Sequence, residues 1–287
     1  MITVISNPWE QIQKSGRFDF GQLLDAAFIK FKVHLKMADS NHLLVDQISQ
    51  METNISEFPR PRSPIRLSND FLDDDINEPA VVLGSSFLQY GTRVSIISAF
   101  AALDDFLLAV SICFEAFEKL SNEKPFTIKD LQEARIRGFK RAHKSGASEE
   151  LIKKLGVEYI DSKALEMIAQ LKAMRNCLVH RWGIVANKDL NSEDKAKLIF
   201  EYFDHRVDKN FTELLKNQHG DIVNHPQSVK QCSYGLGEEI IFSSMECQKV
   251  LITLDILVRG ILWGTLEWCK ATGKVKESNI NTEKQPS

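Results

Sequence analysis

The stretch from Ser85 to Leu120 constrains the fold more than any other part of the chain. It carries long apolar side chains at helical spacing, with no proline and no glycine after Gly91. This pattern predicts one long helix. The apolar positions that define it are Ile97, Phe100, Leu103, Leu107, Val110, Phe114 and Phe117.

Further segments repeat apolar residues in steps of three and four, as amphipathic helices do. They run from Leu23 to about Val45, from Ser162 to Arg181, over 191–216, and from Met245 to about Lys270. The polar stretch Asp39-Ser40-Asn41 interrupts the apolar pattern of the first segment. That segment could therefore form one helix or two. The sum is a mainly α protein, a helical bundle.

The remaining segments are predicted to be irregular or β. Residues 1–20 form an irregular lead-in, and 272–287 form a polar, disordered tail. Prolines and an acidic run mark 58–79 as a surface excursion or a short linker. Val229 to Tyr234 and Ile240 to Phe242 predict a small β-hairpin near 229–242. We expect 21–271 to be one domain.

Composition excludes several classes of protein. A net charge of -3 is unsuited to binding polyanions over the whole surface, so nucleic acid would need a local patch. Five cysteines without a Cys-x-x-Cys pair argue for reduced thiols rather than disulfides or a zinc cluster. The start lacks a signal-peptide pattern, and 250–263, taken as the longest apolar stretch, is shorter than the roughly 20 residues of a membrane span. We expect a soluble, cytoplasmic protein with no metal ion and no cofactor.

The end of the helix predicted from Ser162 to Arg181 carries the most chemistry. Arg175, Asn176 and His180 fall within two turns there, and Gly183 is a plausible C-cap. Arginine binds phosphate as a rigid fork of donors, and histidine gains or loses a proton near neutral pH. These are the two groups that a metal-free cleavage of a phosphodiester needs.

The spacing alone is weak evidence. An arginine followed four to six residues later by histidine occurs by chance on the order of once in a chain of this length. Arg137 and His143 show such a spacing in a polar stretch without apolar periodicity. A purely structural interpretation of the Arg175 motif is a helix end at which His180 and Arg181 favour the negative pole of the dipole.

Two other features bear on the same chemistry. Asp104 falls at helical spacing on an otherwise apolar face, where a carboxylate needs a partner, and Arg175 is the obvious one. Asp105 is the alternative acid. Asp104 could equally be a partly exposed residue at the edge of the apolar stripe. The stretch 121–148 is basic and could follow an RNA backbone, or form an ordinary solvated helix. Its candidate contacts are Arg135, Arg137, Lys140 and Arg141.

The pattern Arg175-Asn176-x-x-x-His180 resembles the Arg-polar-x(3–5)-His signature of the HEPN superfamily, in which an acidic residue on a preceding helix accompanies the motif. The likeness covers roughly Ser85 to Phe211. It implies a HEPN-like helical domain of a larger variety, extended at its C-terminus. Small antitoxin-paired HEPN toxins carry tyrosine two residues after the histidine, and Trp182 stands there instead. Nucleotidylation at that place is therefore in doubt.

The resemblance implies a metal-independent endoribonuclease that cleaves RNA through its own 2'-hydroxyl. His180 would be the general base or acid, and Arg175 would bind the phosphate. Asn176 would orient the ring of His180 or bind phosphate, and Asp104 would fix Arg175. It also implies a homodimer and a role in toxin or antiviral defence, with an antitoxin or defence-system partner. The alternatives are a non-catalytic HEPN-like module that binds RNA or protein, and a helical protein with a chance motif.

Overall fold

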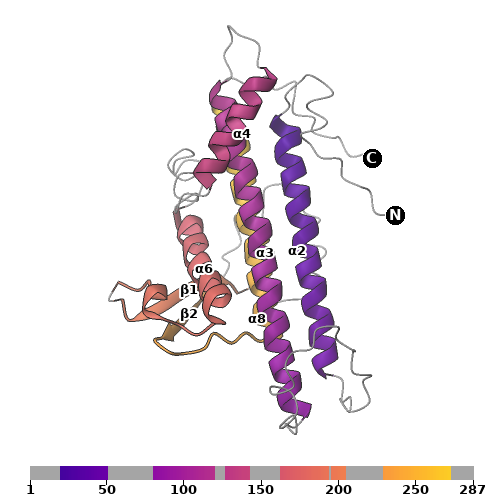
Figure 1. Cartoon of the computed structure of the whole chain (residues 1–287), viewed down its shortest axis with the longest axis vertical. Coiled ribbons are helices and arrows are strands. Elements are labelled where there is room, and N and C mark those ends of the chain that lie inside the picture. Colours follow the sequence, from indigo (N-terminus) through magenta and orange to yellow (C-terminus); the bar gives the residue numbers. More distant parts are fainter. Residues whose placement is uncertain are drawn as a thin grey trace, which may run out of the picture.

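The computed structural model describes residues 20–50, 80–119, 127–142, 162–193, 195–204 and 229–272. Within these ranges the chain is mainly helical with one small antiparallel sheet, which confirms the expected fold class (Figure 1). The elements in order are α2 (Phe20–Gln50), α3 (Ala80–Lys119), α4 (Ile128–Ala142), α6 (Ser162–Arg181), η3 (Asn187–Asp189), β1 (Lys197–Phe203), β2 (Val229–Gly235) and α8 (Ser244–Ala271).

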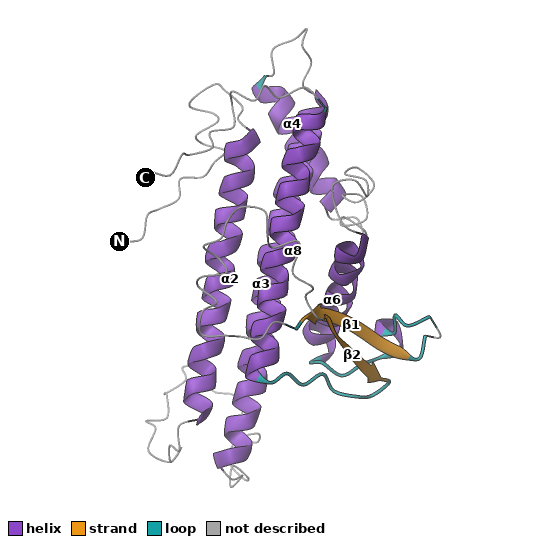
Figure 2. Cartoon of the chain, turned by 180° about the vertical axis from the view of Figure 1, so that it is seen from behind, coloured by secondary structure: helices purple, strands orange, loops and turns teal. Residues whose placement is uncertain are grey.

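The central element is α3, the helix with the strongest apolar pattern. The long helices α2 and α8 lie beside it, as both views of the ribbon show (Figures 1 and 2). On its other side α4 packs near the C-terminal end of α3, and α6 lies lower with the sheet (Figure 1). All the apolar positions predicted for α3 are buried except Ile97, which is half-buried.

The helix α2 is continuous through Asp39-Ser40-Asn41, so the chain forms one helix there rather than two. His42 explains part of this continuity, because its buried ring lies 3.0 Å (Nε2) from the backbone oxygen of Ser244 at the start of α8. Asn41 donates a hydrogen bond to Ser95 Oγ at 3.1 Å. These contacts tie the polar stretch of α2 to α8 and α3 instead of leaving it to break the helix.

The sheet replaces part of a predicted helix. Residues 191–216 were expected to be helical, but Lys197–Phe203 is strand β1, and 205–228 lies outside the described residues. In β1 the side chains of Leu198, Phe200 and Tyr202 are fully buried while their neighbours are less so. This period of two is the pattern of a strand with one covered face, and it outweighs the accidental three-and-four spacing.

The strand predicted at 229–234 exists, but its partner differs from the expectation. β2 pairs antiparallel with β1, from Lys197 opposite Gly235 to Phe203 opposite Val229. Residues 237–240 instead join the segment after α6: Val185 N donates to Glu238 O at 2.9 Å, and Ile240 N donates to Gly183 O at 2.9 Å. The chain beyond α6 is thereby fixed to the chain beyond β2.

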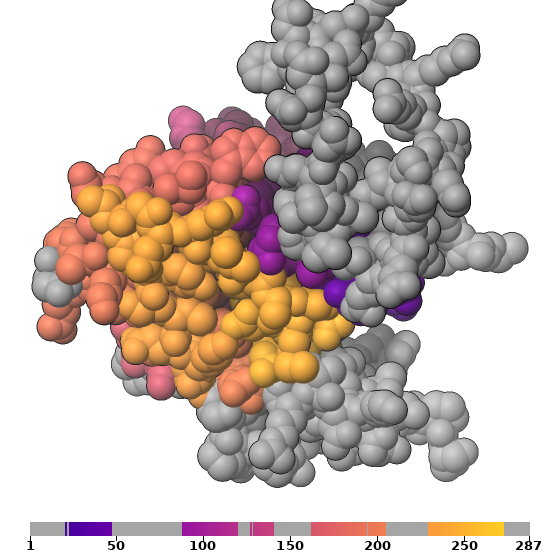
Figure 3. All heavy atoms as spheres, turned by 90° about the horizontal axis from the view of Figure 1, so that it is seen from below, coloured from indigo at the N-terminus to yellow at the C-terminus, as the bar shows by residue number. Residues whose placement is uncertain are grey.

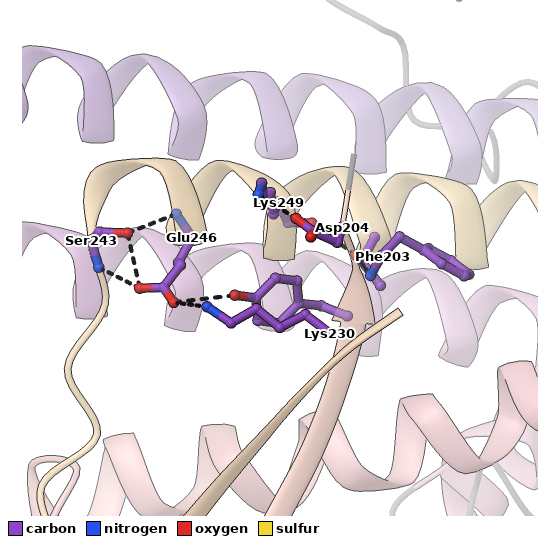
Figure 4. Close-up of polar contacts among 8 residues, drawn as sticks. Phe203, Asp204, Lys230, Ser243, Glu246 and Lys249 are labelled. Atoms are coloured by element: carbon purple, nitrogen blue, oxygen red, sulfur yellow. Dashed lines mark hydrogen bonds and ion pairs between the residues drawn. The ribbon is translucent and has the colours of Figure 1, made fainter. Parts of the chain in front are cut away.

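A polar cluster ties the sheet to the start of α8 (Figure 4). The side chains of Ser243 and Glu246 cap the helix reciprocally, and Glu246 also accepts hydrogen bonds from Lys230 Nζ at 2.6 Å and Tyr202 Oη at 3.2 Å. Burial alone would raise the pKa of Glu246, but hydrogen bonds from Lys230 and Ser243 outweigh it and lower that pKa to about 2. The carboxylate therefore stays charged and holds β1, β2 and α8 together.

The described residues leave some expectations open. Three predicted segments fall outside the described residues. They are the lead-in of 1–20 except for its last residue, the excursion at 58–79, and the tail from 273 onward. Leu88–Lys119 is long and apolar enough to cross a membrane by length and composition, so 250–263 is not the longest apolar stretch. Most of the apolar window of α3 is buried inside the fold, as in core helices generally, so this feature alone assigns no location.

Gly138 allows the close approach of α4 to α3. A Cβ there would lie 2.8 Å from the backbone N of Ile112, whereas a Cβ at Gly260 in α8 would meet nothing within 4 Å. We expect Gly138→Ala to destabilise the protein by about 1–3 kcal/mol through overpacking. Gly260→Ala should stabilise it by about 0.5–1 kcal/mol, because glycine is the poorer helix former. Urea unfolding measures both, and equal effects would contradict this packing.

Candidate functional site at the end of α6

One side of α6 is covered by the protein and the other is open. The predicted stripe of Met167, Leu171, Met174 and Leu178 is buried, with Ala164 partly so. On the opposite side Ala169, Asn176 and His180 are exposed, and Ala173 is half-buried. The candidate side chains therefore lie on the solvent side of a helix whose apolar side anchors it.

The end of α6 is fixed by an unusual turn. Trp182 and Gly183 both have positive φ, at 55° and 88°, and Gly183 N donates to Cys177 O at 3.2 Å. Glycine takes this conformation without strain, which confirms Gly183 as the residue that ends the helix. Ile184 and Val185 then pair with 238–239, so the turn is held from both sides.

Asp104, Arg175 and Asn176 are in direct contact. Arg175 Nη2 donates to Asp104 Oδ2 at 3.0 Å, and Nη1 donates to Asn176 Oδ1 at 3.0 Å. The predicted pairing of Asp104 with Arg175 is therefore present, and it joins α3 to α6. The alternative acid, Asp105, points elsewhere and pairs with Lys30 of α2 at 2.7 Å.

The guanidinium of Arg175 keeps donors available. Arginine has five N–H donors, and the two contacts above use one on each terminal nitrogen. One terminal hydrogen on Nη1 and one on Nη2 remain, and the side chain is 27% exposed. The buried Nε has no hydrogen-bond partner in the described part of the chain. The terminal hydrogens that these contacts leave unused are donors of the kind that bind phosphate.

His180 lies one turn beyond Asn176 on the exposed side of α6. Within the described ranges its ring makes no hydrogen bond or ion pair. About 140° of helix surface separates His180 from Arg175, and Asn176 lies between them in that arc. Because Arg175 bonds to Asn176, the polar groups follow the helix surface from the α3 side toward His180. An elongated substrate across this surface could touch all of them.

Two residues near the motif were not predicted. Lys172, one turn before Arg175, places Nζ 3.5 Å from Asp104 Oδ1. Its spacing of three from Arg175 was a signal that could have been used. Asp189 is buried, accepts from Arg181 Nε at 2.6 Å and from Ala186 N at 2.9 Å, and forms a second contact with Arg181 Nη2. No spacing in the sequence predicts that this loop carboxylate is buried and paired with Arg181.

Arg181 is thus a structural residue rather than part of the exposed site. Its side chain is 16% exposed, its partner's is 3% exposed, and the pair fastens the helix end to η3. Arg181 also interacts with the thiol of Cys177, whose pKa is raised chiefly by burial. Arg175, in the motif, and Arg181, the residue after it, therefore serve different purposes.

The predicted basic contacts lie on another part of the molecule. Arg135, Arg137 and Lys140 are exposed on α4, while the side chain of Arg141 is outside the described residues. Gly138 of α4 faces Ile112 of α3, and Trp182 faces Tyr90, which is roughly 30 Å lower along the same helix. The basic residues are therefore not gathered around His180, although α4 and α6 both pack against α3 (Figure 1).

Figure 3 shows the lower end of the molecule, where the segment 162–204 (salmon) lies beside the segment 229–272 (orange to yellow). Among the residues with described positions, no group of three or more His, Cys, Asp or Glu side chains could hold a metal ion.

Comparisons with protein-family models, with curated proteins and with solved structures gave no significant match. The site must therefore be judged from its own residues.

The contrast between Arg175 and Arg181 can be tested by stability. Arg181→Gln leaves a buried carboxylate without its partner and should cost about 3 kcal/mol. Arg175→Gln breaks a pair whose acid is 45% exposed and should cost less than about 1 kcal/mol. Urea unfolding of both variants measures the difference. A loss at Arg175 equal to that at Arg181 would mean that Arg175 is there for structure.

Proposed function

We propose that the protein is a metal-independent endoribonuclease of HEPN type, which cleaves RNA by attack of its 2'-hydroxyl. The observation that carries the proposal is the network of Asp104, Arg175 and Asn176, with His180 exposed one turn further on. It combines an oriented phosphate-binding fork with a group that can exchange protons at neutral pH. Both lie on an open surface that RNA can reach.

The reaction needs little else from the protein. The 2'-oxygen forms a bond to phosphorus, the bond from phosphorus to the 5'-oxygen breaks, and a 2',3'-cyclic phosphate and a 5'-hydroxyl result. A base must accept the 2'-hydroxyl proton, and an acid must give one to the 5'-oxygen. His180 fits either role, because histidine is the side chain that most often serves as general acid or base. Arg175 would stabilise the negative charge on the phosphorane.

Asp104 acts through Arg175 rather than on the RNA. The pair is partly exposed, so its contribution to stability is small, and its value lies in orienting the fork. Lys172 adds a second cation beside the same carboxylate. Two cations against one carboxylate leave a positive local charge, which favours a phosphate there.

A homodimer would supply two copies of His180, one as base and one as acid. The open side of α6 with its small Ala169 is compatible with the approach of a second copy. We also propose a cytoplasmic location and a role in toxin or antiviral defence, with an antitoxin or another defence component as partner. These follow from the resemblance of the motif alone.

The competing function is a HEPN-like module that binds RNA or protein without cutting. One observation favours it: in the described structure no side chain orients the ring of His180, whereas a catalytic base is commonly held by a second group. The ends of the RNA products and the need for His180 separate the two functions.

His180→Ala tests the chemistry directly. We expect the parent protein to release fragments that end in a cyclic phosphate, and the variant to be at least about 100-fold slower. His34→Ala is the matched control, since His34 is an exposed histidine of α2 on a different helix. End-labelled RNA resolved by electrophoresis and mass spectrometry gives both rates and ends. Fragments with a 3'-hydroxyl end, or RNA binding without cleavage, would reject the nuclease.

Asp104→Asn tests the positioning role, and Asp105→Asn is its neighbour-matched control. The first should lower the cleavage rate by roughly tenfold at saturating RNA, because the Arg175 fork loses its charged anchor. The second should leave the rate unchanged, since Asp105 pairs with Lys30 away from the site. Asp104→Glu should recover part of the rate. Equal rates for Asp104→Asn and Asp105→Asn would remove Asp104 from the site.

A further inference from the structure

We propose that Trp182 and Tyr90 form a stacking platform for a base of single-stranded RNA bound at the end of α6. The inference rests on the proposed function and narrows its substrate to an unpaired strand. It also assigns a binding role to two residues that lie outside the Arg-Asn-x3-His motif.

Two large exposed rings meet beside the motif. Trp182 is 65% exposed and Tyr90 is 54% exposed, and their ring centroids lie 6.4 Å apart with 24° between the planes. The rings come from the turn after α6 and from α3. Tyr90 stacks against the indole, and Trp182 still keeps most of its surface exposed. An exposed aromatic face is the surface on which an unpaired base stacks.

The backbone holds Trp182 in a costly position. Its φ of 55° lies in the left-handed region, which is rare for a bulky side chain. The hydrogen bond from Gly183 N to Cys177 O and the pairing of Ile184 with Glu239 enforce the turn. Left-handed residues end many helices and also cluster at functional sites, and here the turn presents an indole outside the core.

The platform is continuous with the candidate site. His180 is two residues before Trp182, and Arg175 is seven before, a rise of about 10 Å along a helix. On α3, Tyr90 and Asp104 fall on nearly the same face about 21 Å apart, so the seam between α3 and α6 has the rings at one end and the phosphate-binding group at the other. That arrangement suits a short strand whose phosphate meets Arg175 and whose base reaches Trp182.

The chemistry of the surroundings favours nucleic acid over an apolar protein segment. Lys172 and Arg175 share one carboxylate, so the end of the seam toward Asp104 has an excess of positive charge. Glu239, which pairs with Ile184 just after Trp182, is engaged by Arg93. A single strand of a few nucleotides satisfies both ends at once, with one phosphate at Arg175 and a base further along the strand at Trp182. Stacking also explains why a duplex, whose bases are already paired and stacked, would be excluded.

The test uses a single-stranded oligonucleotide with 2'-O-methyl groups, which cannot be cleaved by its own hydroxyl. Binding is followed by fluorescence anisotropy of the labelled oligonucleotide and by quenching of tryptophan emission. We expect Trp182→Ala to weaken binding roughly tenfold. Trp182→Phe should keep most of the affinity and lose the quenching. Trp263→Phe is the matched control, because Trp263 is 66% exposed on α8, and it should retain both.

Several outcomes would overturn the platform. They are parent-like binding by Trp182→Ala, quenching that survives Trp182→Phe, equal binding and quenching by a duplex, and no binding by the parent protein. A shift from dimer to monomer in Trp182→Ala, with RNA binding unchanged, would assign the ring to a protein interface instead. Circular dichroism of each variant confirms folding.

The same experiment separates the platform from the nuclease. His34→Ala should bind and quench like the parent protein, since His34 is exposed on α2 and belongs to neither the platform nor the candidate site. If the parent protein binds and quenches but never cleaves RNA, the nuclease fails and the platform stands. If the parent protein cleaves RNA and Trp182→Ala cleaves and binds equally well, the platform alone fails.

Discussion

The burial of α3 is the constraint on which the rest of the molecule depends. Its apolar side chains contact α2 and α8 on one side and α4 and α6 on the other. Phe100, Phe106 and Phe117 are almost completely buried, and a side chain of this size contributes about 1.5–3 kcal/mol when removed from water. The shorter elements cannot form such a core alone, so their positions are set by where they meet α3.

The candidate site lies at one of these contacts, between α3 and α6. α3 supplies Asp104 to Arg175 and Tyr90 to Trp182, so two contacts along one helix fix how the end of α6 is presented. The ion pair of Arg181 with buried Asp189 holds the turn from the other side. Arg175 makes a partly exposed contact with Asp104 and keeps a terminal hydrogen on each Nη that a ligand can reach. The difference between these two arginines is the main support for a functional interpretation of the motif.

Much of this arrangement could be predicted from the sequence, because long helices leave a regular apolar pattern. The helices α3, α6 and α8 followed from the spacing of apolar residues. The pairing of Asp104 with Arg175 was one of the alternatives that spacing and the family resemblance left open. β1 was mistaken for a helix, since Ile199 and Phe203 are also four apart and only burial reveals the period of two. The partner of β2, the stacking of Tyr90 on Trp182, and the burial of Asp189 depend on distant segments and leave no local signal.

The central claim is that Arg175 and His180 act on one phosphate, and a double-mutant cycle of RNA cleavage tests it most directly. The rates of Arg175→Gln, His180→Ala and the double variant are compared with the parent rate under single-turnover conditions. If both groups serve one transition state, the double variant should be hardly slower than the worse single variant. Losses that multiply, or a parent protein that does not cleave RNA, would contradict the account.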